Sequence, residues 1–306
     1  MSREHVFLTT VIATKGRPEL LRRTLLSIKD ACKPPGYRGV IVVENGPEQL
    51  VKAFVETEDW GCPVHYYYLR EAHKSKALNV ALEEVREGLV YFNDDDVRLE
   101  KNTLTAVHAV AQNLQGKFFL GGPVGVEYEK KPPAWLKQYC AYGDGWAYPS
   151  LSVAQVSEAC FLGANWVAAA EDVRRVGGFP VRFGPTQPSK GEDTKVQRLL
   201  MAAGILGYYV PDARVWHYVS WRECTPQSVL HEGYRRSFSA AIFDDCSLAM
   251  RCAALLKNCC SLVRDSFLWV WFVMRGNASA AFFRRYTINC RFGDAIGRLQ
   301  SGWRHP

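Results

Sequence analysis

The sequence predicts an α/β fold, in which a mainly parallel sheet is flanked by helices and followed by a helical extension at the C-terminus. Apolar runs of strand length alternate with helical patterns over residues 6–92, as in parallel sheets that are covered on both faces. Polar residues follow three of these runs, at the edge where such sheets bind ligands. From Pro226 onward, the spacing of apolar residues is helical.

Local composition assigns the individual elements. Strands are predicted at residues 6–13, 39–43, 64–69 and 89–92, which are rich in apolar and β-branched side chains. Pro18 occupies the favoured first position of a helix, and further helices are predicted through residue 54 and over residues 77–85. A turn at Pro211 leads into a short strand over residues 214–217. We expect an aromatic binding loop at residues 139–148 and a mobile loop at residues 184–191, which enters a helix at Glu192.

The composition is that of a globular protein. The chain has 306 residues, 48% hydrophobic and 23% charged, which excludes a disordered protein. We expect one large domain over residues 1–225 and an appended region over residues 226–306. The ten cysteines form no CxxC pair and no zinc-type spacing with histidine, so free thiols in a reducing cytosol are expected. No secretory leader is recognisable, which favours a cytoplasmic location.

Positive charge is concentrated in the last part of the chain. Residues 246–306 contain nine Lys/Arg and two acids, which accounts for the whole net charge of +7. A neutral body with a basic tail indicates an anionic partner surface, for which we favour lipid on the cytoplasmic face of a membrane over nucleic acid. Residues 267–274 are too short to span a bilayer, which needs ~20 residues, and are typical of an interfacial segment. The alternative is a helix that packs on the body or on a second subunit.

Three consecutive acids, Asp94, Asp95 and Asp96, follow the strand predicted at residues 89–92. Adjacent carboxylates repel one another unless a cation lies among them. Oxygen ligands of this kind suit Mg²⁺ or Mn²⁺, and these ions in turn suit phosphate oxygens. The triplet therefore predicts a metal and a phosphorylated ligand, although acid runs also occur on solvated loops.

Short motifs follow one another along the chain. They are, in order, VIATKGRP (11–18), VVENG (42–46), KSKALN (74–79), FNDDDV (92–97), GAN (163–165), VGGF (176–179), GED (191–193) and PDARVWH (211–217). In this order they resemble the family 2 glycosyltransferases over roughly residues 6–240. The resemblance implies the GT-A fold, a Rossmann-like sheet with a nucleotide-sugar half at about residues 1–97 and an acceptor half at about residues 98–225.

The resemblance also implies an activity. Members of this kind move a sugar from a nucleotide-diphosphate donor to a hydroxyl acceptor, with Mn²⁺ or Mg²⁺ as cofactor and inversion at the anomeric carbon. We favour a UDP-sugar, with dTDP or GDP as alternatives, and a glycan, lipid-linked or cell-surface polysaccharide precursor as acceptor. The QxxRW motif and the membrane spans of processive members are absent from this sequence, so one sugar per encounter is expected.

The resemblance implies donor-side roles for individual residues of this sequence. Asp96 is the expected metal ligand, and Asp94 is expected to contact the ribose or a metal-bound water. Asp95 has no specific role among the donor-binding acids. His217 can complete the metal site, since imidazole suits Mn²⁺, or contact the diphosphate. Further donor-binding residues are Thr14, Arg17, Glu44, Asn45, Lys74 and Asn79. Glu44 departs from the family's commoner Asp, which leaves its nucleobase contact open.

On the acceptor side, Asp193 matches the family's general base, and Glu192 is expected to support it. A carboxylate in a first helical turn is also favoured simply by the helix dipole, which is the structural alternative for Asp193. Sugar rings pack on aromatic faces, so aromatic residues of the middle region are candidates for the acceptor site. The acceptor candidates are Trp135, Trp146, Asn165 and Trp166. Homo-oligomers through the C-terminal helices are a further possibility.

Two other functional classes remain open. A sugar-phosphate nucleotidyltransferase would use similar chemistry, but it would need a glycine-rich basic loop after the first strand, and residues 10–18 contain only Gly16. A non-catalytic binding protein of the same fold is disfavoured by the intact acids Asp94, Asp96 and Asp193.

Overall fold

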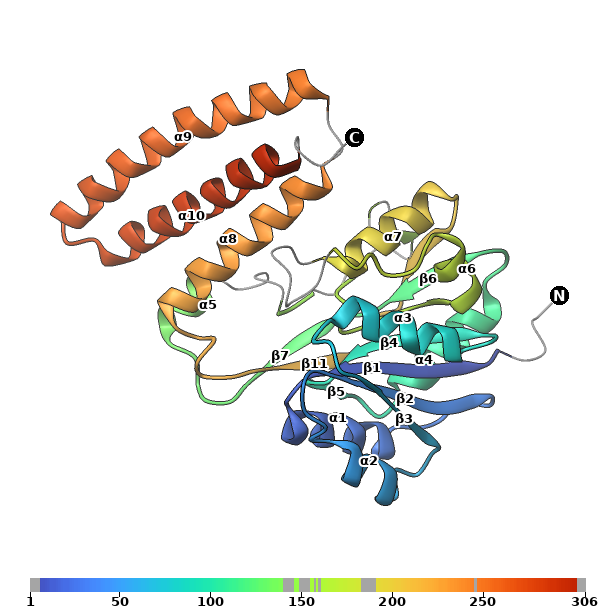
Figure 1. Ribbon diagram of the computed structural model, residues 1–306. Coiled ribbons are helices and arrows are strands. Elements are labelled where there is room, and N and C mark those ends of the chain that lie inside the picture. The colour runs from blue at the N-terminus through green and yellow to red at the C-terminus, as the bar shows by residue number, and fades with distance from the viewer. Residues whose placement is uncertain are drawn as a thin grey trace. The chain divides into compact units, whose positions relative to one another are not determined.

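A computed structural model describes residues 6–139, 146–148, 155–156, 158, 161–182, 191–244 and 247–301 (Figure 1). The chain divides into two compact units. The first comprises residues 1–127, 145–186 and 192–218, and the second comprises residues 128–144, 187–191 and 219–306. Most of the two loops predicted at residues 139–148 and 184–191 lies outside the described residues.

The first unit contains a large sheet of eight strands in the order β3-β2-β1-β4-β9-β6-β10-β8. These strands are β1 (Leu8–Thr14), β2 (Tyr37–Asn45), β3 (Val64–Leu69), β4 (Leu89–Asp94), β6 (Phe118–Gly121), β8 (Gln155–Val156), β9 (Trp166–Ala169) and β10 (Leu206–Tyr209). The four strands β1 to β4 pair in parallel, which confirms the fold class predicted from the sequence. Strand β9 is antiparallel to both β4 and β6.

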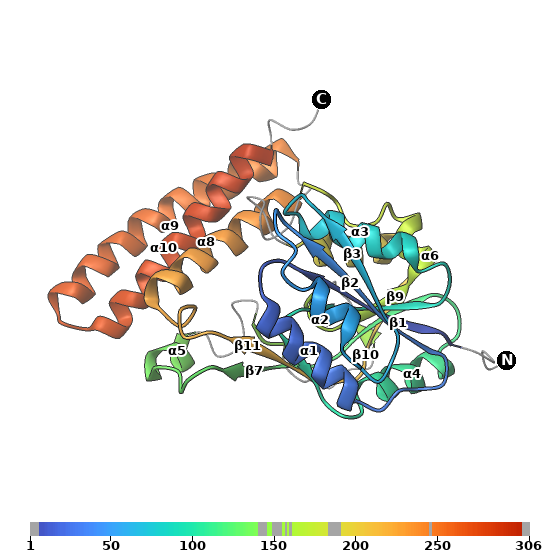
Figure 2. The same cartoon turned by 60° about the horizontal axis from the view of Figure 1, so that its bottom comes forward.

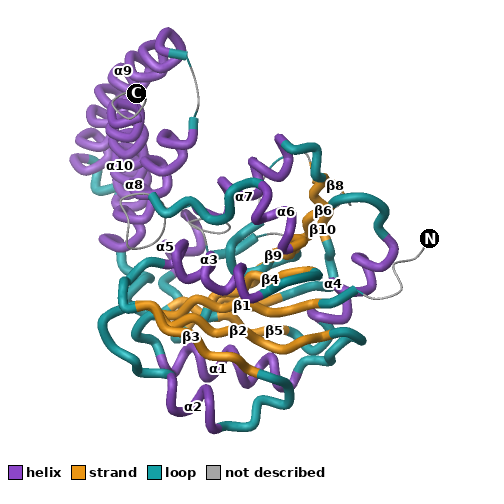
Figure 3. The backbone as a smooth tube through the Cα atoms, turned by 45° about the vertical axis from the view of Figure 1, so that its right-hand side comes forward, coloured by secondary structure: helices purple, strands orange, loops and turns teal. Residues whose placement is uncertain are grey.

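Helices cover both faces of this sheet (Figure 3). They are α1 (Pro18–Asp30), α2 (Lys52–Thr57), α3 (Lys74–Glu84), α4 (Thr103–Asn113), α6 (Ala170–Arg175) and α7 (Glu192–Ala202). Apolar side chains of α1, α2 and α4 pack in one core with Val40 and Val42, whereas α3, α6 and α7 pack in a second core with Ile41 and Val43. The alternation along β2 shows that the two cores lie on opposite faces, as expected for a buried parallel strand.

A small sheet of three strands, in the order β5-β11-β7, extends from the acid triplet. Its strands are β5 (Val97–Leu99), β7 (Val124–Tyr128) and β11 (Val215–Val219). Strands β5 and β11 are antiparallel, and Val97 pairs with His217. This pairing brings the histidine of the last motif beside the acids that precede β5.

The second unit consists mainly of helices: α5 (Ala134–Tyr139), α8 (Pro226–Phe243), α9 (Leu248–Met274) and α10 (Ala278–Ser301). Helix α8 begins at Pro226, as predicted, and the Thr225 side chain caps it by accepting from the Ser228 amide. Helix α10 lies between α8 and α9 in both ribbon views (Figures 1 and 2). Its Gly293 and Gly297 face α8 so closely that a Cβ would lie 2.2 Å from the Tyr234 carbonyl oxygen and 2.5 Å from that of Phe238.

The described helices include none that combines the length and the apolar composition needed to cross a bilayer. Seven of the ten cysteines are described, and each of them is a free thiol. The described free thiols are Cys32, Cys62, Cys224, Cys252, Cys259, Cys260 and Cys290.

Candidate active site

The acid triplet lies where β1, β2 and β4 end. Register pairs Ala13 with Asp94 and Thr14 with Glu44, so the polar residues after these strands meet at one edge of the sheet. Asp94 is the last residue of β4, and Asp95 and Asp96 form the turn into β5. The sequence placed the three polar clusters at this edge, and the structure brings them together there.

Asp95 is the buried anchor of the triplet. Its Oδ2 accepts hydrogen bonds from Thr14 Oγ1 at 2.6 Å and from Arg17 Nε at 3.2 Å. Its main-chain oxygen accepts from Thr24 Oγ1 at 2.9 Å, which ties the turn to α1. Burial raises the pKa of Asp95, and the charge of the Arg17 guanidinium opposes that rise. Asp95 therefore fixes Thr14 and Arg17, a role that its sequence context did not distinguish from those of its neighbours.

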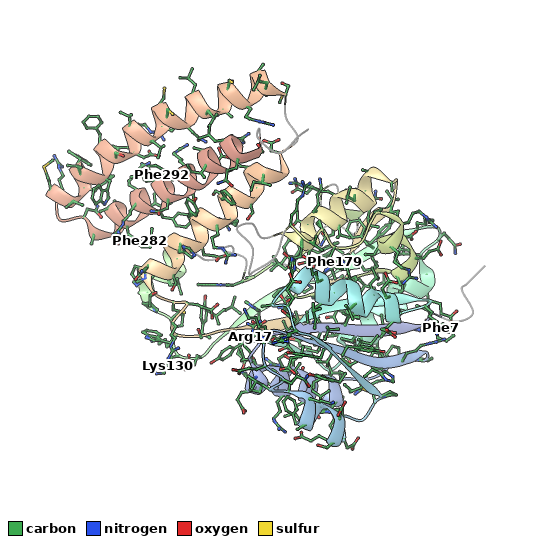
Figure 4. All side chains as sticks on the ribbon, in the orientation of Figure 1. Phe7, Arg17, Lys130, Phe179, Phe282 and Phe292 are labelled. Carbon is green, nitrogen blue, oxygen red and sulfur yellow. The ribbon has the colours of Figure 1, made fainter. Side chains whose placement is uncertain are left out.

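Asp96 follows in the same turn, and its side chain is 11% exposed. Arg17 Nη1 donates to its Oδ2 at 2.8 Å, and His217 Nε2 lies 3.3 Å from its Oδ1 (Figure 4 labels Arg17). Burial alone would raise the pKa of Asp96, but His217 and Arg17 lower it to about 2. This carboxylate is therefore ionised throughout the neutral range.

Asp96 and His217 form a donor pair that fits a divalent cation. The Asp96 Oδ1 atom is buried and, apart from the contact with His217 Nε2, has no hydrogen-bond partner within the described residues, so it retains a lone pair for an ion. No group of three or more His, Cys, Asp or Glu side chains in the described part of the chain could hold a metal by itself. Mg²⁺ is commonly held by one or two protein ligands together with substrate phosphates and water. The pair therefore suits an ion that arrives with a diphosphate.

Lys74 connects the triplet to the predicted base. It begins α3, and its Nζ lies 2.7 Å from Asp94 Oδ1, 3.2 Å from Glu192 Oε1 and 3.8 Å from Asp193 Oδ2. Burial alone would lower the pKa of Lys74, but the carboxylates of Asp94, Asp193 and Glu192 raise it well above its ordinary value. One ammonium, on a side chain that is 18% exposed, thus balances carboxylates from two segments that are about a hundred residues apart in the sequence.

Asp193 lies in the first turn of α7, where its position depends on two residues that sequence reasoning missed. Trp166 Nε1 donates a hydrogen bond of 3.2 Å to its Oδ1. Gly163 leaves room for its Oδ2, because a Cβ on that glycine would lie only 2.2 Å away. Burial raises the pKa of Asp193 to about 7, and the charge of Lys74 opposes that rise. A carboxylate with this pKa can take a proton near neutral pH.

Trp166 itself differs from its predicted use. It is fully buried, its ring stacks on Phe92 with centroids 4.4 Å apart, and Phe179 packs against it edge-on. Its faces are therefore not open to a sugar in this structure, and its polar edge orients Asp193 instead. The pairing of β9 with β4 causes this, because it sets Trp166 opposite Phe92.

Several predicted donor contacts serve the protein itself. The buried Glu44 carboxylate accepts from the Leu50 amide at 2.6 Å and from Tyr66 Oη at 2.6 Å. Asn45 Nδ2 donates to the Thr14 carbonyl at 2.8 Å. Asn79 exchanges two hydrogen bonds of 2.8 Å with the main chain of Phe179. These three residues shape the edge of the sheet, and a ligand contact would require them to exchange partners.

The remaining acceptor candidates belong to both units of the chain. Asn165 is buried and bonds to Tyr91 Oη at 2.8 Å and to the main-chain oxygens of Pro123 and Ala213. Trp146 is also buried. Trp135 belongs to the second unit, where its ring lies edge-on to Phe282 with centroids 5.0 Å apart.

One family model matches most of the chain, and several solved structures share its fold. The family described as "Glycosyltransferase like family 2" matches residues 5–239. The mannosyltransferase PcManGT from Pyrobaculum calidifontis, solved with GDP-Man and Mn²⁺, has a TM-score of 0.61 at 18% identity, over 99% of this chain and 89% of that one. The S. aureus TarS fragment 1–349 gives 0.51 at 15% identity, with 80% and 68% covered.

GalNAc-T7, solved with UDP, GalNAc and Mn²⁺, gives a TM-score of 0.52 at 13% identity, over 71% of this chain and 44% of that one. At these identities the solved structures show a shared fold alone. No curated protein sequence matches the chain.

Proposed function

The chain belongs to the glycosyltransferase like family 2, and we propose that it moves one sugar per encounter from a nucleotide-diphosphate donor to a hydroxyl acceptor, with inversion. The observation that carries this proposal is the position of Lys74, whose ammonium joins Asp94 of the acid triplet to Asp193. A donor-binding carboxylate and a poised base then share one site. Direct displacement needs this arrangement, because the attacking oxygen and the leaving diphosphate occupy opposite sides of the anomeric carbon.

The donor side would be held by charge. Asp96 and His217 are the residues that would hold Mn²⁺ or Mg²⁺, with Asp94 close by. Such an ion, when bound, neutralises the leaving diphosphate as a Lewis acid. Arg17 is anchored by Asp95 and remains about half exposed, so its guanidinium can also reach a phosphate oxygen.

The acceptor side would depend on Asp193. Its carboxylate takes the proton of the acceptor hydroxyl while that oxygen forms the new bond to the anomeric carbon and the bond to the diphosphate breaks. Trp166 and Gly163 fix the carboxylate, and Lys74 balances the surrounding negative charge. A base with a pKa of about 7 suits this transfer at neutral pH.

The family resemblance guides the choice of donor and acceptor, and the basic tail guides the choice of location. We favour UDP over dTDP and GDP, and an acceptor that is a glycan or a lipid-linked precursor of a polysaccharide. The basic tail supports a peripheral location on the cytoplasmic face of an anionic membrane, where lipid-linked acceptors occur. The catalytic part is proposed to be residues 1–225.

Donor turnover with and without Mn²⁺ tests the reaction class. Metal-dependent release of free sugar and nucleoside diphosphate is expected, whereas pyrophosphate-dependent exchange would indicate a nucleotidyltransferase and the absence of both would indicate a binding protein. The donor itself can be identified by thermal shift with UDP-, GDP- and dTDP-sugars. A true donor at a hundred times its Kd stabilises the fold by about 2.7 kcal/mol.

A further inference from the structure

Helix α9 buries a charged side chain and exposes apolar ones. Its buried Asp265 faces α10, whereas Leu256, Val263, Phe267 and Met274 are exposed on its other side. The exposed residues are seven, four and seven positions apart, which places them along one face of a helix. Figure 4 shows side chains that project from α9 away from α10. The apolar face therefore has no cover within the described chain.

Exposure of apolar side chains is greatest at the end of α9. We define the hairpin tip as residues 267–275 of α9 and the turn, together with residues 283–285 of α10. Phe267 and Met274 are each 74% exposed and Val273 is 53% exposed. Trp269 and Val273, four residues apart, add a second apolar face beside the one formed by Phe267 and Met274. A single protein partner would cover one face, whereas a hydrocarbon phase surrounds all of them.

The charges on this hairpin favour an anionic partner. Asp265 is fully buried and is bound by Arg264 at 3.0 Å, Arg284 at 3.2 Å and Arg291 at 2.8 Å. Burial alone would raise the pKa of Asp265, but the hydrogen bonds from Arg291 and Arg264 lower it, so it stays ionised.

The second acid of the hairpin, Asp294, is bound by Arg298 at 2.8 Å. Both acids of residues 246–306 are therefore neutralised from within the unit. Lys257, Arg275 and Arg285 are exposed, and no described acid pairs with them. The surface beside the apolar face is consequently basic.

We propose that the hairpin tip inserts into the interface of an anionic bilayer and holds the enzyme there. Trp269 and Trp271 suit the headgroup level, where the amphipathic indole ring is favoured. Arg275 and Arg285 are placed to contact lipid phosphates, while Phe267 and Met274 enter the acyl boundary. A second copy of the chain is the disfavoured occupant, because it would bring the same cations against this surface. The proposal deepens the membrane location proposed above, and it does not depend on the catalytic assignment.

Vesicle binding by the full chain tests this proposal. We expect the protein to float with vesicles of phosphatidylcholine and phosphatidylglycerol and to bind vesicles of phosphatidylcholine alone much more weakly. The double variant Phe267→Ser/Met274→Ser should bind at least tenfold more weakly, because large apolar side chains drive interfacial insertion. Arg275→Gln and Arg285→Gln should each lower the preference for anionic vesicles about fivefold.

Matched controls keep the test specific. Leu26→Ser/Leu206→Ser removes two exposed apolar side chains from the first unit and should leave vesicle binding unchanged. Donor hydrolysis in solution should be unchanged in the tip variants, since these residues lie outside the catalytic machinery. Equal binding by the tip variant and the unsubstituted chain would overturn the proposal. A dimer that sedimentation detects for the unsubstituted chain but not for the tip variant would also overturn it. Absence of donor hydrolysis in every variant would refute the proposed function without affecting the vesicle result.

Discussion

The hydrogen bond from Trp166 to Asp193 makes a quantitative prediction for Trp166→Phe. The indole N–H donates to the buried Asp193 carboxylate at 3.2 Å, and phenylalanine keeps an aromatic ring but removes this donor. A hydrogen bond to a charged group contributes about 1.5–3 kcal/mol. Losing it destabilises the ionised form, so the pKa of Asp193 should rise by about one to two units from its present value of about 7.

The consequence is a rate loss that depends on pH. Only the ionised carboxylate can accept the proton, so kcat/KM should rise with pH through the pKa of Asp193. At pH 7 the ionised fraction would fall from about one half to between about 10% and 1%, which lowers kcat/KM about 5- to 50-fold. Above the shifted pKa, the variant should recover most of the rate of the unsubstituted enzyme.

The assay is a pH profile of kcat/KM for donor turnover. Phe179→Leu is the matched control, because it removes an aromatic neighbour of the same ring and leaves the N–H donor in place. The control should lose stability without a shift in the midpoint of the profile. A uniform loss across all pH values in Trp166→Phe, or an unchanged midpoint, would refute the idea that this hydrogen bond tunes the base.

Three further substitutions test other parts of the site and fold. Gly163→Ala places a Cβ 2.2 Å from Asp193 Oδ2 and should lower kcat about a hundredfold. Donor affinity, measured by calorimetry, should be unchanged. Normal turnover would mean that the carboxylate can relocate. Asp96→Asn should abolish the extra thermal stabilisation that Mn²⁺ gives with a nucleotide, and an undiminished effect would assign the metal elsewhere. Asp265→Ala leaves three guanidiniums without their anion and should cost about 3 kcal/mol in urea unfolding, and a loss below about 1 kcal/mol would contradict its structural role.

The sequence predicted those strands and helix starts whose signals lie within the segment itself. The strands β1 and β4 are buried on both faces, so their apolar runs stand out against the polar residues that end them. The start of α8 was also predictable, because Pro226 has a favoured position behind the capping Thr225. The polar strand ends follow from the same parallel topology, which is why the triplet and Glu44 could be expected at one edge.

The parts that were not predicted depend on contacts between distant segments. Trp166 was predicted to stack on a sugar because it is aromatic. Nothing in the local sequence indicates that β9 pairs with β4 and buries the indole ring. Asp95 could not be separated from Asp94 and Asp96, since only the folded chain gives it Thr14 and Arg17 as partners. The sequence indicated an interfacial segment at residues 267–274 but left a helix packed on the body or on a second subunit open, because a helical pattern alone does not tell which face a neighbour covers.

Transfer and donor binding by Asp193→Ala test the central claim most directly. The substitution removes the proposed base and leaves Asp96, His217 and Arg17 in place on the donor side. We predict that the donor binds in the presence of Mn²⁺ with the affinity of the unsubstituted enzyme, whereas sugar transfer to an acceptor falls to background. Normal transfer by this variant would contradict the account, because the proton would then leave the acceptor by another route.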